Sequence, residues 1–115
     1  MSRKKSPDSV GILSSKAMGL AELLDYQDGA VVSQTIVSKK NGTVTVFAFA
    51  KGQGLSTHSA PFDALVYILA GEARITIAGK ALKVGAGEMV IMPANKPHAL
   101  KALQPFKMML VMVKS

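Results

Sequence analysis

The residue type in this chain best suited to chemistry is histidine, which occurs twice, as His58 and His98. An imidazole ring titrates near neutral pH, donates or accepts a hydrogen bond, and binds transition metals. Each ring follows a stretch with special backbone requirements: a glycine-rich bend at 52–57 and a proline-containing loop at 93–97. Cysteine is absent, which excludes disulfides, thiolate metal sites and a cysteine nucleophile. The chemistry of this chain is therefore to be sought where the two imidazoles meet.

Three interpretations of the histidine pair remain open. In the first, His58 and His98 bind a divalent transition metal such as zinc, copper, nickel or iron, and water or substrate completes the coordination shell. A site with only two protein ligands is usually weak, and its affinity falls below about pH 6.5 because binding needs neutral imidazole. In the second, the pair orients a small polar or anionic ligand, or acts as general acid and base. In the third, both rings are cavity residues that hydrogen-bond to each other or to water.

A series of short strands must position the two histidines. The sequence predicts strands at 30–38, 43–50, 65–69, 73–77, 81–84, 88–92, 98–103 and 106–113. Between the first two, Asn41-Gly42 is typical of a two-residue hairpin turn whose central residues have positive φ. Only residues 15–24 suit a helical turn. Short strands at close spacing, with almost no helix, predict a small β sandwich or barrel.

Length and composition indicate a single small domain. The chain has 115 residues, of which 49% are hydrophobic, so we expect one domain at 11–115 behind a flexible basic tail at 1–10. No apolar run is long enough to cross a bilayer, and no hydrophobic signal region follows the basic start. A cytoplasmic protein without a membrane partner is the prediction. The net charge of +7 is spread thinly and aromatic residues are few, so we expect no specific nucleic-acid partner.

Two of the predicted strands are apolar on both faces. Residues 65–69 and 108–113 contain no charged side chain. One face of such a strand fills the barrel, and the other must meet a second sheet or a second subunit. We therefore expect a homodimer in which the partner covers an otherwise exposed apolar face.

The spacing of glycine, proline and histidine around the two rings resembles the two motifs of the cupins. The first motif, G-x5-H-x-H-x3-4-E-x6-G, and the second, G-x5-P-x-G-x2-H-x3-N, are met in part. The residues in place are Gly52, His58 and Gly71 of the first motif and Gly87, Pro93 and His98 of the second. Asn95 stands where the second motif has glycine, and asparagine also tolerates a left-handed backbone. The resemblance covers residues 30–113 and implies a small single-domain cupin, an all-β protein with an RmlC-like double-stranded β-helix, or jelly-roll, barrel.

Three positions depart from the cupin motifs. Alanine stands at Ala60, where the family has a second histidine, at Ala64, where it has glutamate, and at Ala102, where it has asparagine. The resemblance implies a metal held by three or four such ligands, with manganese among the candidates. Only His58 and His98 remain here to hold it. If the protein is an enzyme, the resemblance implies an oxygenase, isomerase or decarboxylase acting on a small organic molecule.

Alternation along the strands predicts the wall of a pocket around the histidines. Side chains two, four and six positions after His58 face the same way, and Asp63 faces outward. The predicted wall residues are Ala60, Phe62, Ala64, Met92, Met108, Leu110 and Met112. Methionine suits both an adaptable pocket and an ordinary core, and both interpretations stay open.

The function predicted from the sequence is binding of a small molecule in the barrel, with a weakly held divalent metal on the two histidines. The alternative is a dimeric barrel without metal that senses a ligand or serves a structural role. The expected partners are thus a small-molecule ligand and a second copy of the chain.

Overall fold

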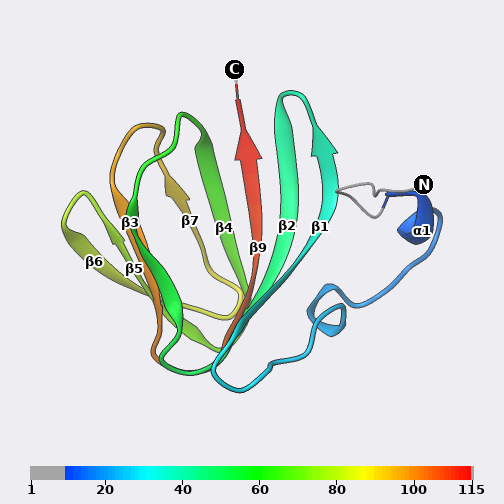
Figure 1. Cartoon of the computed structure of the whole chain (residues 1–115), viewed down its shortest axis with the longest axis horizontal. Helices are drawn as coiled ribbons and strands as arrows, with labels where there is room; N and C mark the ends of the chain where they lie inside the picture. The colour runs from blue at the N-terminus through cyan, green and yellow to red at the C-terminus, as the bar shows by residue number, and fades with distance from the viewer. Residues whose placement is uncertain (1–9, 115) are drawn as a thin grey trace.

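The computed structural model describes residues 10–114, and these form two antiparallel sheets that face each other (Figure 1). The elements, in chain order, are α1 (Val10–Leu13), the 3₁₀ helix η1 (Leu20–Glu22), β1 (Val31–Lys39), β2 (Gly42–Phe49), β3 (Gly54–His58), β4 (Asp63–Ala70), β5 (Glu72–Ile77), β6 (Lys80–Gly85), β7 (Met89–Met92), β8 (His98–Ala102) and β9 (Phe106–Val113). The predicted tail at 1–10 lies outside the described residues, apart from the first residue of α1. No helix among the described residues is long and apolar enough to cross a membrane.

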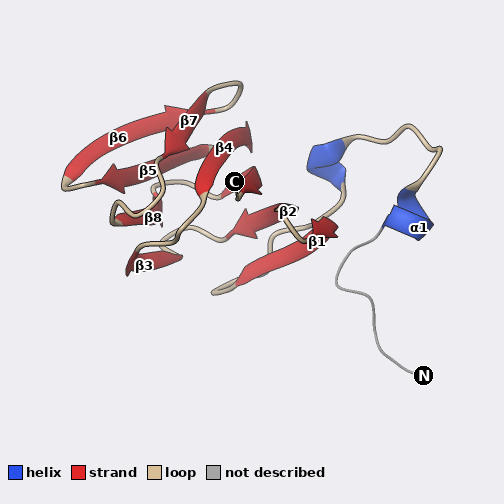
Figure 2. Cartoon of the chain, turned by 90° about the horizontal axis from the view of Figure 1, so that it is seen from above, coloured by secondary structure: helices blue, strands red, loops and turns tan. Residues whose placement is uncertain are grey.

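The strands enter the two sheets in alternation, as in a double-stranded β-helix. One sheet has five strands in the order β1-β2-β9-β4-β7, and the other has four in the order β3-β8-β5-β6. From β2 to β5, and again from β6 to β9, each strand lies in the sheet opposite its predecessor. Figure 2 shows the four-stranded sheet on the left and β1 and β2 of the five-stranded sheet on the right, with the short helices beyond β1 and β2. This topology confirms the predicted all-β jelly-roll.

Alternating apolar residues of both sheets form the core between them. On β4 the side chains of Ala64, Val66 and Ile68 are buried, as the two-residue period of a strand requires. The rings of Phe49 and Phe106 stack with their centroids 4.4 Å apart. Full burial of a large apolar side chain stabilises the fold by about 1.5–3 kcal/mol relative to exposure. This core holds the two sheets, and through them the strands that carry the histidines.

The hairpin between β1 and β2 forms, but its turn differs from the predicted one. Lys39 pairs with Gly42, so the turn residues are Lys40 and Asn41 rather than Asn41 and Gly42. None of the residues at 40–42 has positive φ. Gly42 already belongs to β2, where a Cβ would come within 3.0 Å of the Met112 carbonyl oxygen. Close approach of two strands, and not turn geometry, accounts for glycine at this position.

The sequence prediction lacks β3, because its residues contain no run of apolar side chains. The strand forms through its pairing with β8, in which Leu55 is opposite Leu100 and His58 is opposite His98. A Cβ on Gly54 would collide with the Leu100 carbonyl oxygen, so glycine permits the close approach of the two strands. The predicted helical turn at 15–24 is reduced to η1.

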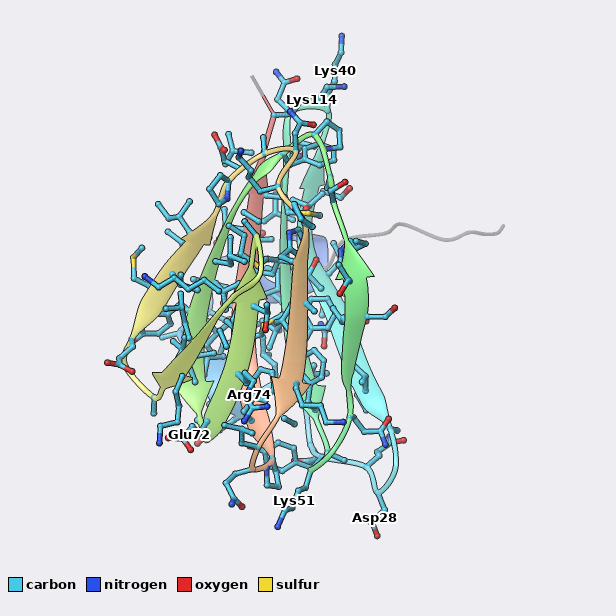
Figure 3. All side chains as sticks on the ribbon, turned by 90° about the vertical axis from the view of Figure 1, so that its left-hand side faces the viewer. Asp28, Lys40, Lys51, Glu72, Arg74 and Lys114 are labelled. Atoms are coloured by element: carbon cyan, nitrogen blue, oxygen red, sulfur yellow. The ribbon has the colours of Figure 1, made fainter. Side chains whose placement is uncertain are left out.

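Basic side chains occupy the ends of the barrel and the outer face of the four-stranded sheet (Figure 3). Lys40 and Lys114 extend from one end of the barrel. Arg74 on β5 lies between Lys101 on β8 and Lys83 on β6, and all three are exposed. These cations form one short row on this sheet and separate groups elsewhere.

Candidate functional site

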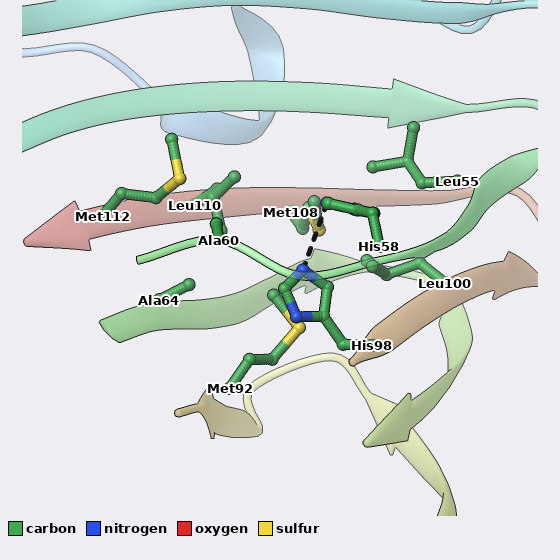
Figure 4. Close-up of a pocket in the computed structure, with 10 residues that line it drawn as sticks. All are labelled: Leu55, His58, Ala60, Ala64, Met92, His98, Leu100, Met108, Leu110 and Met112. Carbon is green, nitrogen blue, oxygen red and sulfur yellow. Dashed lines mark hydrogen bonds between the residues drawn. The ribbon is translucent and has the colours of Figure 1, made fainter. Parts of the chain in front are cut away.

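The structure brings His58 and His98 into contact where β3 meets β8 (Figure 4). His58 is the last residue of β3, and His98 is the first of β8. Their Nε2 atoms lie 3.2 Å apart, and their ring centroids are 4.4 Å apart with the ring planes at 72°. His98 is buried, with 6% of its surface exposed, whereas His58 is exposed. One ring therefore faces the interior, and the other reaches solvent.

The hydrogen bonds determine which nitrogens carry protons in the neutral pair. The Nδ1–H of His58 donates to the carbonyl oxygen of Ser56 at 2.9 Å, because a carbonyl oxygen can only accept. The Nε2 of neutral His58 is then an acceptor, so His98 donates from its own Nε2. The Nδ1 of His98 is left buried and without a hydrogen-bond partner among the described residues. In the neutral pair, His98 is thus the donor and His58 the acceptor, and the lone pair on Nδ1 of His98 is buried without a donor to bind it.

Burial lowers the pKa of His98 below its ordinary value of 6.5. Removal from water disfavours the imidazolium, and the neighbouring charge of His58 acts in the same direction. The backbone carbonyl of Lys96 favours the imidazolium and is the smallest of the three effects, because it does not meet the geometry of a hydrogen bond to Nδ1. His98 therefore stays neutral at pH values where an exposed histidine is already protonated.

The loop before β8 is fastened to the rim of the site by two hydrogen bonds. The backbone N–H of Ala94 donates to the Asp63 carboxylate at 2.9 Å, and that of Asn95 donates to the Ala60 carbonyl oxygen at 2.8 Å. Asn95 has a φ of 66°, which confirms the left-handed backbone expected there. Asp63 is exposed and is bonded to the loop rather than to either histidine. Its role is to hold the loop that leads into His98.

A cavity of about 50 Å³ opens beside the histidine pair (Figure 4). Its walls are formed by Leu55, His58, Ala60, Ala64, Met92, His98, Leu100, Met108, Leu110 and Met112. One water needs about 10–15 Å³ of such space, so the cavity admits several waters or a molecule of about four non-hydrogen atoms. Apart from the two imidazoles, every wall residue is alanine, leucine or methionine. The site therefore combines one polar corner with an apolar enclosure.

Six of the seven wall residues expected from the sequence lie against this cavity, and Phe62 does not. The chain bends at 61–62 between β3 and β4, which interrupts the alternation counted from His58. Leu55 and Leu100 complete the wall without having been expected. Leu100 follows His98 by two residues on β8, so alternation along that strand was a usable signal. Leu55 lies on β3, for which the sequence carried no signal.

The donor set does not complete a site for the divalent metals that the resemblance implies. Among residues 10–114, no group of three or more His, Cys, Asp or Glu side chains comes together. Ala60 and Ala64 line the cavity at the places of a histidine and a glutamate, and their methyl groups cannot coordinate. Two imidazoles remain, whereas zinc in proteins commonly has three or four protein ligands. No step of a metal-dependent reaction can be assigned to these residues.

Comparison with known proteins identifies the family. The family model described as "Cupin domain" matches residues 45–114, and the chain belongs to this family. The expected resemblance is therefore confirmed. Among curated proteins, none matches the chain.

Similar solved structures share the barrel along most of the chain. A conserved protein of unknown function from Streptococcus pyogenes is 40% identical with a TM-score of 0.85, over 88% of this chain and 89% of that one. A cupin 2 conserved barrel domain protein from Leptotrichia buccalis is 44% identical with a TM-score of 0.82, over 84% of this chain and 47% of that one. This chain thus spans about half of the Leptotrichia protein. A cupin superfamily protein from Desulfitobacterium hafniense is 27% identical with a TM-score of 0.84, over 88% of this chain and 93% of that one.

Proposed function

We propose that the protein binds a small molecule in the cavity of its barrel, with His58 and His98 as the polar anchor. The observation that carries this proposal is the convergence of two Nε2 atoms, 3.2 Å apart, at a cavity whose other walls are apolar. Binding sites for small molecules combine mostly apolar walls with a few polar groups that fix the ligand's orientation. Both features support this function.

The protonation state of the pair favours a ligand with a hydroxyl-like group. His58 offers a lone pair on Nε2, and His98 offers an N–H on its Nε2. A hydroxyl inserted between the rings donates to the first and accepts from the second. It thereby replaces the hydrogen bond between the rings without leaving either nitrogen unpaired.

The cavity limits the affinity as well as the size of the ligand. About 50 Å³ of open space admits a core of about four non-hydrogen atoms. The best very small ligands gain about −1.5 kcal/mol per non-hydrogen atom, so the limit is about −6 kcal/mol, or a Kd of about 40 µM. A search for the ligand must therefore extend to millimolar concentrations.

Protein-observed NMR with a series of small alcohols, ketones and carboxylic acids tests the proposal. We expect the histidine ring resonances of His58 and His98 to shift together on binding, and the effect to be lost in His58→Ala. Met89→Leu is the control, because Met89 is 50% exposed and lies outside the cavity. Shifts that map away from the cavity, or no shifts at millimolar concentration, would contradict the proposal.

A divalent metal on the same two nitrogens is a second proposal, which their separation supports. Two Nε2 atoms 3.2 Å apart suit two adjacent positions of a coordination shell with metal–nitrogen bonds of about 2.0–2.1 Å. Because only two protein ligands are available, we expect weak, partial occupancy by Zn, Ni, Mn, Fe or Cu. Elemental analysis of untagged protein measures the occupancy, which should vanish in His58→Ala. Tightly held stoichiometric Zn, Ni, Mn or Fe, or no metal after incubation with each ion, would contradict this expectation.

The alternative function is that of a metal-free barrel that senses a ligand or serves as a dimeric scaffold. Binding without turnover in the NMR series favours sensing, and the absence of any binding favours the scaffold.

Oxygenase, isomerase or decarboxylase activity, a cytoplasmic location and the lack of a nucleic-acid or membrane partner stay predictions from the sequence.

We also propose that a second copy of the chain covers the outer face of the five-stranded sheet. Cross-strand pairing supports this with two apolar rows, which are Ile91, Leu65, Val111, Val44 and Val37, and beside them Met89, Tyr67 and Met109. We call these eight residues the outer apolar face; Val46, which continues the second row, is already fully buried within the chain. None of them is charged, and Met89 and Ile91 are 50% and 51% exposed. Depletion of charge is the mark of an interface centre, and a second copy presents the same apolar rows.

A further inference from the structure

Three thioether side chains share the cavity with the two histidines: Met92, Met108 and Met112. Met92 and Met108 are only 3% and 1% exposed, and Met112 is half-buried. Ala64 on β4 pairs with Met92 on β7 and with Met112 on β9. Ala64 stands where the cupin motif has glutamate, so two sulfur-bearing residues flank the place of the missing carboxylate.

The methionines and the histidine pair line one space. In Figure 4 the side chain of Met108 is drawn beside the contact between the two rings and that of Met92 beside the His98 ring, and Met112 lies farther along the cavity. All of them line the same space of about 50 Å³. Two imidazole nitrogens and at least two thioether sulfurs are therefore available to one small occupant.

This donor set is soft and uncharged. Thioether sulfur favours Cu(I), imidazole suits copper in general, and carboxylate oxygen suits magnesium, calcium and manganese. None of the wall residues is aspartate or glutamate. The cost of taking an ion out of water rises with the square of its charge, so a monovalent ion enters an uncharged cavity far more readily than a divalent one. The chemistry of the wall thus selects a soft monovalent cation.

The separation of the two nitrogens requires further ligands. With metal–nitrogen bonds of about 2.0–2.1 Å, two Nε2 atoms 3.2 Å apart subtend an angle of roughly 100–105° at the ion. That angle excludes linear two-coordination and leaves one side of the ion open. Met92 and Met108 line the same cavity and can supply the remaining donors.

The protons of the pair also allow an ion to enter. His58 already presents its Nε2 lone pair, because its Nδ1–H is bonded to the Ser56 carbonyl oxygen. His98 must move its proton from Nε2 to Nδ1, which is buried and has no hydrogen-bond partner among the described residues, so the new metal–nitrogen bond must offset the cost of one unpaired N–H. The shift is a change of tautomer, so the neutral pair accepts the ion without net release of a proton.

We propose that the cavity binds Cu(I) through the Nε2 atoms of His58 and His98 and the thioether sulfurs of Met92 and Met108. Such a site differs from the carboxylate-containing sites of the divalent cupins, because methionine supplies the donors that Ala60 and Ala64 cannot. The organic ligand proposed above is not needed for it.

Competition with bicinchoninate under anaerobic conditions tests the site. We expect the wild-type protein to withdraw one equivalent of Cu(I) from the coloured bicinchoninate complex. The double variant Met92→Leu/Met108→Leu should hold Cu(I) at least about tenfold more weakly, a loss that even outer-sphere partners of a metal cause. Leucine is close to methionine in volume, so the fold is retained, and circular dichroism checks this. Met18→Leu, which is exposed and lies outside both the cavity and the outer apolar face, should bind as the wild type does.

A second measurement needs no variant. With methyl-labelled methionine and Ag(I) as a soft, redox-inert substitute, the methyl resonances of Met92 and Met108 should shift and that of Met89 should not. No withdrawal of Cu(I), equal affinity in the double variant, or shifts confined to exposed methionines would overturn the proposal. If no small molecule binds in the NMR ligand series, the Cu(I) measurements can still succeed. The proposal of small-molecule binding and the proposal of a Cu(I) site can therefore be rejected independently.

Discussion

At the scale of single residues, His98 links the site to the stability of the fold. Its pKa in the folded protein lies below 6.5 because burial, and next the charge of His58, disfavour the imidazolium. In the unfolded chain the same ring titrates near its ordinary pKa of about 6.5. Between the two pKa values the unfolded chain binds more protons than the folded one. The free energy of unfolding therefore decreases as pH falls below 6.5, and it is unaffected by this ring at higher pH.

We predict that urea unfolding of the metal-free protein, with a chelator present, shows lower stability at about pH 5.5 than at about pH 7.5. The part due to His98 cannot exceed about 1.4 kcal/mol per pH unit, the limit for one proton. His98→Gln removes the titrating group and should flatten the dependence. An equal slope in this variant, or stability that rises on acidification, would show that another group is responsible.

The two alanines of the wall give a second prediction at this scale. The double variant Ala60→His/Ala64→Glu adds an imidazole and a carboxylate to the cavity that holds His58 and His98. We expect it to bind Zn(II) at least about a hundredfold more tightly than the wild type, because four protein ligands replace two. Isothermal titration calorimetry measures the change, and His58→Ala in the same background should reverse most of it. Unchanged affinity would mean that these two positions are out of coordinating reach.

The meeting of the two histidines was predictable, but their protonation was not. His58 follows Gly52, and His98 follows Pro93, at the spacing of the two cupin motifs. That spacing was enough to predict that the two rings meet. Their tautomers depend on the carbonyl oxygen of Ser56 and on the burial of one ring. A backbone acceptor leaves no trace in residue identity, since every residue carries one.

At the scale of elements, the position of His58 depends on how closely β3 approaches β8. A Cβ on Gly54 would collide with the Leu100 carbonyl oxygen and come within 3.2 Å of the Lys101 Cα. Both are backbone atoms in a paired strand and cannot rotate away. We predict that Gly54→Ala lowers the free energy of unfolding by about 2 kcal/mol or more.

Chemical denaturation measures this loss, and the histidine ring resonances report whether the two rings separate. Gly11→Ala is the matched control, since a Cβ there meets nothing within 4 Å, and a surface change of this kind stays within about 0.5 kcal/mol. Equal stabilities of the two variants would show that β3 can move outward at no cost.

The elements that were predictable are those whose own side chains alternate or are continuously apolar. The predicted strand at 106–113 is confirmed as β9 with the same bounds. β3, whose residues read GLSTH, is a strand only because β8 pairs with it. The turn at Lys40 and Asn41 was predicted one residue too late for a related reason. Gly42 is required by the close approach of β2 to the neighbouring strand, and not by the turn. Long-range pairing overrides local preference in both places.

At the scale of the whole molecule, the outer faces of the two sheets differ in charge. The four-stranded sheet carries the exposed row of Lys101, Arg74 and Lys83, and the five-stranded sheet carries the outer apolar face. At one end of the five-stranded sheet, the Nζ of Lys107 donates to the Ala21 carbonyl oxygen at 2.6 Å and lies 5.1 Å from the centroid of the Tyr26 ring. The chain's own N-terminal segment thus contacts this sheet near Lys107. From the sequence we expected a second copy to cover an apolar face of this sheet. The contact between Lys107 and the chain's own N-terminal segment was not predictable, because a single lysine on β9 does not indicate its partner.

The outer apolar face gives the prediction for the whole molecule. Val111 lies in the middle of its first row, between Leu65 and Val44. If two copies meet there, Val111→Lys places an ammonium group in the apolar centre, where an unpaired charge costs several kcal/mol. We expect the wild type to sediment as a dimer and Val111→Lys as a folded monomer, with circular dichroism as the check on folding. Ala81→Lys, on the exposed face of the basic sheet, should stay dimeric. A wild type that is monomeric at high concentration, or a Val111→Lys variant that remains dimeric, would show that this face is not the interface.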